Sequence, residues 1–89
     1  MQHHGRTQAC PLCAGQVRED RRYPRYVCRE CLKGGVLVDG TGVSLQQMGR
    51  TVLEVSSIKC TVNGIACEAR EAHFGGVVVQ VIGTVIRAT

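Results

Sequence analysis

Hydrophobic residues in this chain occur in short runs separated by polar or glycine-rich turns. The most apolar run, residues 77–82, is nearly continuous and rich in β-branched side chains, which predicts a central strand buried on both faces. Residues 51–55 alternate between apolar and polar positions as a half-buried strand does. The runs at 36–38 and 43–45 flank a glycine-rich connection at 39–42 and predict a hairpin.

Asn63-Gly64 lies between two further β-rich runs, residues 58–62 and 65–69. Asn-Gly between such runs is the strongest short signal for a two-residue hairpin turn. With this loop, position 62 pairs with 65, 61 with 66, and 60 with 67. Residues 68–74 are expected to make one or two helical turns, which the glycines at 75 and 76 then end.

The composition indicates that a small core needs additional support. The chain has 89 residues with one Phe, two Tyr and no Trp, so few large side chains are available for burial. A domain of this size buries a smaller fraction of its surface than a domain of about 150 residues does. The six cysteines are the expected support.

Four of the six cysteines form two Cys-x-x-Cys pairs, and fourteen residues separate the pairs. Zinc takes four thiolates at the corners of a tetrahedron, and two such pairs supply two thiolates each. We expect a hairpin between the pairs, with residues 16–19 and 23–27 as its arms, to bring them together. The spacing therefore predicts a metal site at Cys10, Cys13, Cys28 and Cys31.

These cysteines also carry a resemblance to a known class of proteins. The zinc-ribbon class has two zinc knuckles that resemble CPLCAG at residues 10–15 and YVCREC at residues 26–31. The resemblance covers residues 8–33 and implies one zinc ion; because four thiolates fill its coordination positions, the site is expected to be structural. A weaker resemblance over residues 60–80 is to small bacterial zinc-ribbon proteins that have no assigned role.

Three other interpretations of the four cysteines stay open. An iron site of the rubredoxin kind uses the same ligands, although those electron carriers are acidic and rich in aromatic residues, unlike this chain. A disulfide framework needs an oxidising compartment, and residues 1–9 lack the apolar core of a signal peptide. A thioredoxin-like redox pair needs a βαβ setting, and no helix of the right length is expected after Cys13.

Cys60 and Cys67 form a second pair, which the Asn-Gly hairpin places opposite each other. The simplest interpretation is two small buried apolar side chains. One alternative is a second zinc site completed by His73 and a carboxylate, Glu68 or Glu71. Another is a regulatory disulfide. Positions 60 and 67 form a hydrogen-bonded pair, the wider of the two kinds in an antiparallel ladder, which is an unfavourable place for a disulfide. The alternative function is thus a metal- or thiol-dependent redox or regulatory protein.

Positive charge is concentrated in the first part of the chain. The whole chain carries 11 basic and 7 acidic residues, and residues 1–35 hold seven of the basic ones against three acids. Arginine suits phosphate and tyrosine rings stack on bases, whereas the alternative is a solvated turn paired with Glu19, Asp20 and Glu30. The candidate nucleic-acid-binding residues are Arg18, Arg21, Arg22, Arg25, Arg29, Tyr23 and Tyr26.

The sequence contains no Walker loop and no nucleophile elbow. We therefore expect a non-enzymatic structural-zinc module that binds protein or nucleic acid, as a homo-oligomer or as a subunit of a larger assembly. No apolar run is long enough to span a bilayer. Without a signal peptide, a cytoplasmic location is expected.

These observations define an expected fold class. It is a mostly β single domain over residues 1–89, in which a small zinc ribbon at 8–33 is continuous with an antiparallel β-sheet at 36–89. Lys33-Gly34-Gly35 is the expected joint between the two parts. At most one short helix is expected.

Overall fold

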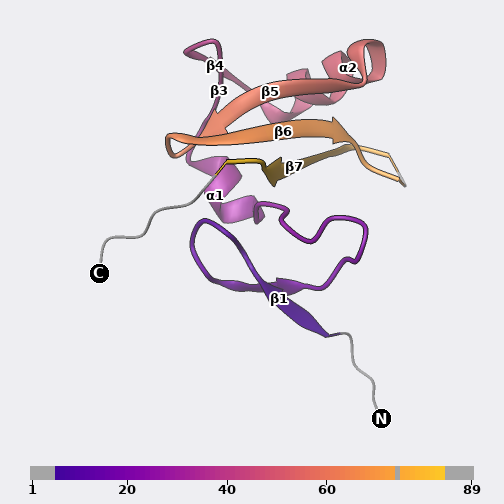
Figure 1. The fold of residues 1–89 in the computed structure, drawn as a ribbon. Coiled ribbons are helices and arrows are strands. Elements are labelled where there is room, and N and C mark those ends of the chain that lie inside the picture. The colour runs from indigo at the N-terminus through magenta and orange to yellow at the C-terminus, as the bar shows by residue number, and fades with distance from the viewer. Residues whose placement is uncertain (1–5, 74, 84–89) are drawn as a thin grey trace.

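The computed structural model describes residues 6–73 and 75–83 and shows a mostly β fold (Figure 1). Its elements, in chain order, are β1 (Thr7–Ala9), β2 (Gln16–Arg18), α1 (Arg29–Lys33), β3 (Val36–Val38), β4 (Thr41–Val43), α2 (Leu45–Val55), β5 (Ser57–Val62), β6 (Ile65–Glu71) and β7 (Val77–Val81). The strands form a two-stranded sheet, β1-β2, and a five-stranded antiparallel sheet with the order β4-β3-β5-β6-β7. The expectation of a mostly β fold with an antiparallel sheet is confirmed, and the described residues form two helices where at most one was expected.

The hairpin β5-β6 has the predicted register. Asn63-Gly64 forms its turn with φ angles of 53° and 77°, the left-handed values that a type I′ turn needs. The predicted pairs form, including position 60 with 67. The hairpin β3-β4 turns in the same way at Asp39-Gly40, so its connection has two residues where four were expected.

The prediction of a strand at 51–55 is wrong, because these residues form the second half of α2. The Ser44 side chain caps this helix by accepting a hydrogen bond from the N–H of Gln47 (3.1 Å), and the two residues have the spacing of a capping box. Met48 and Val52 lie four residues apart and are 1% and 2% exposed. A capped helix with one apolar stripe therefore outweighs the two-residue alternation.

The prediction of helical turns at 68–74 is also wrong, since β6 extends to Glu71. This strand pairs with β5 along one edge and with β7 along the other. Cys67 and Ala69 are buried whereas Arg70 is exposed, which is the alternation of a strand with one covered face. An isolated helix of two turns is marginal in water, so pairing along both edges decides the conformation.

Strand β7 lies at the edge of the sheet and is not the predicted central strand. One of its edges pairs with β6, and the other meets residues 25–27. There the N–H of Val27 donates to the carbonyl of Val79 (2.8 Å), and the N–H of Val81 donates to the carbonyl of Arg25 (3.0 Å). These hydrogen bonds join the N-terminal part of the chain to the five-stranded sheet.

The predicted hairpin between 16–19 and 23–27 is therefore wrong, because β2 pairs with β1 instead. The loop that follows β2 is held by Gln8 from the middle of β1. The Gln8 amide donates to the carbonyl of Tyr23 (3.3 Å) and its amide oxygen accepts the N–H of Asp20 (3.0 Å). No pattern in the sequence marks Gln8 for this role, so sequence analysis missed it.

The core lies on one face of the five-stranded sheet, where α2 contacts β5, β6 and β7. Its most deeply buried side chains are Val36, Met48, Val52, Val62, Cys67 and Val79. Cys10 and Cys31 belong to the same buried cluster, and Figure 1 shows α1 between the sheet and the β1 hairpin. Among the described residues, no helix has both the length and the apolar character needed to cross a membrane.

Candidate metal centre

Two tight turns carry the four cysteines. Cys10 and Cys13 lie in the turn between β1 and β2, and Cys28 and Cys31 lie at the start of α1 and within it. The first turn is closed by hydrogen bonds from the N–H of Cys10 to the carbonyl of Gly15 and from the N–H of residue 14 to the carbonyl of Cys10, both 2.8 Å. The local backbone of each turn therefore fixes the positions of two thiols.

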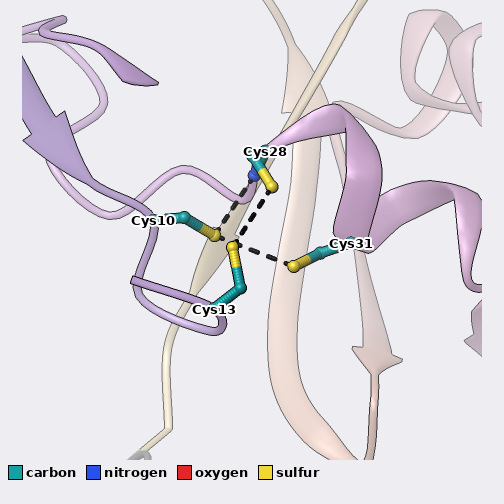
Figure 2. Close-up of side chains that lie close together, drawn as sticks. All are labelled: Cys10, Cys13, Cys28 and Cys31. Carbon is teal, nitrogen blue, oxygen red and sulfur yellow. Dashed lines mark hydrogen bonds between the residues drawn. The ribbon is translucent and has the colours of Figure 1, made fainter. Parts of the chain in front are cut away.

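The four side chains point toward one another (Figure 2). All four sulfur atoms lie within 4.8 Å of one another, with 3.9 Å between the sulfurs of Cys10 and Cys31 and 3.7 Å between those of Cys13 and Cys28. A zinc–sulfur bond of about 2.3 Å gives a sulfur–sulfur edge of about 3.8 Å in a tetrahedron. The thiols thus stand at metal-binding distance and far outside the S–S bond length of about 2.05 Å.

The turns also place main-chain donors next to the sulfur atoms. The N–H of Gly15 donates to Cys13 Sγ and the N–H of Cys28 donates to Cys10 Sγ, each at 3.4 Å. Burial raises the pKa of Cys10, but hydrogen bonds from nearby main-chain N–H groups outweigh it and bring this pKa to about 6. Burial raises the pKa values of Cys28 and Cys31, so a bound cation has to displace protons from these thiols.

The donor set and its surroundings fit a soft divalent cation. Cys10 is fully buried and Cys31 is 9% exposed, whereas Cys13 faces solvent. Four thiolates complete a tetrahedron by themselves, so a zinc ion here would have no position left for water or substrate. Within residues 6–73 and 75–83, no other group of three or more His, Cys, Asp or Glu side chains has metal-binding spacing.

Comparison with protein-family models, curated proteins and solved structures finds no match. The resemblance to the zinc-ribbon class therefore has no support beyond the cysteine spacing and the sulfur geometry described above. The weaker resemblance over residues 60–80 has no support from these comparisons or from the structure.

The second cysteine pair does not form a metal site with His73. Cys60 and Cys67 are opposite each other on β5 and β6 and are buried as free thiols. Strand β6 carries the chain about 13 Å from position 67 to Glu71. His73 lies beyond that end, where its main-chain N–H donates a hydrogen bond to the Tyr23 hydroxyl (2.8 Å). The Glu68 carboxylate forms an ion pair with the exposed side chain of Arg70 instead (3.2 Å).

We expect the thiols of Cys60 and Cys67 to be unreactive in the folded protein at pH 8. Burial raises the pKa of Cys60, and the charge of Glu68 adds to the effect. Burial also raises the pKa of Cys67 to about 11, with a smaller contribution from Cys60. Because the thiolate is the nucleophile, Ellman's reagent should count neither thiol until the protein is denatured.

The same shift predicts a pH dependence of stability. The pKa of the Cys67 thiol is higher in the folded protein than its unfolded value of 9.0. Its contribution to the free energy of unfolding is therefore complete below pH 9 and is lost as the pH rises from 9 toward 11. The free energy of unfolding in urea should fall over that range, and the fall should be smaller in Cys67→Val. Rapid labelling at pH 8, or an identical fall in the variant, would contradict this description of the pair.

The candidate arginines are all exposed, and two of the three acids expected to neutralise them have contacts of their own. Glu30 forms an ion pair with Lys33 (3.2 Å). Asp20 accepts the main-chain N–H of Arg22 (3.0 Å). The Arg25 side chain donates to the carbonyl of residue 83 (3.2 Å). Thus Glu30 pairs with a residue outside this group of arginines, whereas Asp20 contacts the main chain of Arg22, which belongs to it.

The two candidate tyrosines have structural contacts. The Tyr23 hydroxyl accepts the N–H of His73, and the Tyr26 hydroxyl donates to the carbonyl of Arg18. Both side chains are half-buried, and burial raises the pKa of Tyr26, with the charge of Asp20 adding to it. The tyrosines therefore brace the loop after β2, and the arginines are the groups best placed to meet a ligand.

Proposed function

We propose that this protein is a non-enzymatic binding module whose fold is held together by one structural zinc ion. The observation that carries this proposal is the convergence of four thiols from two separate turns at tetrahedral spacing. In a zinc ribbon, the class that the cysteine spacing resembles, the metal has this role. Metal analysis of protein purified under reducing conditions should give one zinc per chain.

The expected role of zinc is to hold the β1-β2 hairpin against α1 and the five-stranded sheet. The first turn supplies two ligands and the α1 region supplies the other two. Binding of structural zinc in small peptides has an apparent free energy of about 10–16 kcal/mol, which exceeds what a small core contributes. Because the ligands are all thiolates from the chain, the metal serves stability and leaves recognition to the surface.

Nucleic acid is one candidate ligand of that surface. The supporting observation is the group of exposed arginines at positions 18, 21, 22, 25 and 29. Because both tyrosines have hydrogen bonds within the fold, contact would be made with phosphate and would depend little on base sequence. Guanidinium groups form paired hydrogen bonds with phosphate oxygens.

Replacing Arg21, Arg22 and Arg25 together by glutamine is expected to weaken nucleic-acid binding by reducing counterion release. The slope of log K against log salt should become shallower by about 2 to 3, since each lost phosphate contact removes about 0.7 to 0.9. The measurement is fluorescence anisotropy with a labelled 20-nucleotide oligothymidine between 50 and 300 mM NaCl. A matched variant that neutralises Arg50, Lys59 and Arg70 controls for net charge.

The two variants remove the same number of charges, so they separate a specific site from general attraction. We expect the control variant to keep most of the slope. If the Arg21/Arg22/Arg25 variant retains wild-type affinity and slope, the nucleic-acid proposal is abandoned. The zinc content of each variant, measured in the same preparations, shows whether the fold has been kept.

A redox or regulatory function through Cys60 and Cys67 has less support. Both thiols are buried, and burial raises their pKa values, whereas reactive cysteines have lowered pKa values and partial exposure. We therefore favour the simpler interpretation, in which both are small apolar side chains of the core.

A further inference from the structure

The outer edge of β7 is only half covered. The register of the β6-β7 pair turns the main-chain groups of even-numbered β7 residues toward β6 and those of odd-numbered residues outward. Residues 25–27 use the carbonyl of Val79 and the N–H of Val81. Val27 lies directly opposite Val79, so the open position is that of Val77: within the described part of the chain, no main-chain partner meets its N–H or its carbonyl.

This open edge borders a groove of about 520 Å³, which we call the β7 groove. It lies between the start of β7, helix α1 and the first residue of α2. Its apolar lining includes Leu32, Leu45, Val77 and Val78. A volume of this size is typical of ligand sites. An extended segment placed here would follow the line of residues 25–27 and meet the unpaired groups of β7.

The charge of the β7 groove is one-sided. Arg29 and Lys33 are the charged side chains on its described lining, and both are basic. Lys33 has an ion pair with Glu30, but the two side chains are 71% and 80% exposed, so the pair is weak and readily exchanged. The ion pairs formed by the described residues do not include Arg29. The groove therefore complements a ligand that carries carboxylates.

We propose that the β7 groove binds an extended acidic peptide segment of a partner protein, which adds to the sheet as a strand beside β7. Main-chain hydrogen bonds to the N–H and carbonyl of Val77 would hold the segment, as in other cases of strand addition. Alternate side chains of the segment enter the groove and meet Leu32 and Leu45, so aliphatic residues fit there. A carboxylate at one end of the segment pairs with Arg29 and Lys33, which lie one helical turn apart on α1.

The inference rests on the proposed function, because zinc fixes the position of α1 and hence one wall of the groove. An open strand edge is also a hazard, since unpaired main-chain groups invite pairing with other chains. Arg29 and Lys33 would then have a second effect, because like charges on two copies of this chain oppose edge-to-edge association.

The test uses the zinc-loaded full chain and a set of fluorescein-labelled nine-residue peptides. Each peptide has valine, leucine or isoleucine at alternate positions, threonine between them, and glutamate at both ends. We expect at least one peptide to bind saturably in fluorescence anisotropy, with the amide NMR signal of Val77 among those that shift. Replacing its glutamates by lysines, or N-methylating alternate amides, should abolish binding.

Variants of the protein locate the site. Replacing Arg29 and Lys33 together by glutamine should weaken binding about tenfold, whereas the matched pair Arg50→Gln and Lys59→Gln should leave it within twofold. Val77→Pro removes an outward N–H that the β6-β7 ladder does not use, and it should weaken binding as well.

Each outcome bears on the proposal. Absence of binding by every acidic peptide, or equal binding of the lysine or N-methylated peptides, would overturn it. Equal losses in the Arg29/Lys33 variant and its matched control would do the same. These peptide controls use the wild-type chain, so they decide the matter even if a variant fails to fold. A zinc-free chain would instead contradict the proposed function, and zinc content is measured in every sample.

Discussion

Replacing Cys31 by serine is expected to abolish stoichiometric zinc binding and to unfold most of the N-terminal part of the protein. Cys31 is 9% exposed and its sulfur lies 3.9 Å from that of Cys10, so the substitution removes one of the four clustered thiols at a buried position. Since structural zinc in peptides contributes about 10–16 kcal/mol, losing even part of this exceeds the usual stability of a small domain.

Zinc content by plasma mass spectrometry and thermal unfolding by circular dichroism measure this effect together. The matched control is Cys60→Ser, which changes a buried thiol in the same way but outside the cluster. We expect the control to keep one zinc and to lose only about 1–3 kcal/mol, the cost of burying a hydroxyl without a full set of partners. Equal zinc content in the two variants would show that Cys31 is not a ligand.

Placing an aspartate at Val52 is expected to be the most damaging change outside the metal centre. Val52 is 2% exposed on the face of α2 that contacts the sheet, and an ionised carboxylate there would be buried without a partner. The free energy of unfolding should fall by about 3–5 kcal/mol. Urea unfolding followed by circular dichroism is the measurement.

Leu53→Asp is the matched control for that substitution. Leu53 is the next residue of the same helix but is 66% exposed, so the change should stay within about 0.5 kcal/mol of the wild type. If the two variants were equally stable, α2 would not pack on the sheet through Val52, and the described core would be incorrect.

Features set by local chemistry could be predicted from the sequence. The Asn63-Gly64 turn formed with the predicted pairing because both residues readily adopt the left-handed φ values of the turn. Each Cys-x-x-Cys pair brings its own two thiols together because it lies in one tight turn. In both cases, a few neighbouring residues contain most of the information. The meeting of the two pairs depends instead on long-range contacts, since the hairpin predicted between them does not form.

Helix α2 was missed although a local signal was present. Ser44 and Gln47 have capping-box spacing, and Met48 and Val52 repeat at the helical interval. Leu53 and Val55 are apolar but lie on the exposed side of the helix. They therefore obscure the apolar stripe and give residues 51–55 the two-residue alternation that is typical of a strand. Attention to the cap would have favoured the helix.

The errors at β6, β7 and residues 23–27 have a different origin. Each concerns pairing between segments that are distant in the sequence, such as the contact of Val27 with Val79. Hydropathy along one strand does not specify its partners, and the valine-rich run at 77–81 fits an edge as well as a centre once another segment covers part of that edge. The bracing roles of Tyr23 and Tyr26 depend on the same long-range arrangement.

We expect one zinc ion to be bound by Cys10, Cys13, Cys28 and Cys31. X-ray absorption at the zinc edge is the test, on protein purified under reducing conditions with its metal content measured. The expected result is one zinc per chain, surrounded by four sulfur atoms at about 2.3 Å. A different metal, a shell that contains nitrogen or oxygen, or a chain that folds without metal would contradict it.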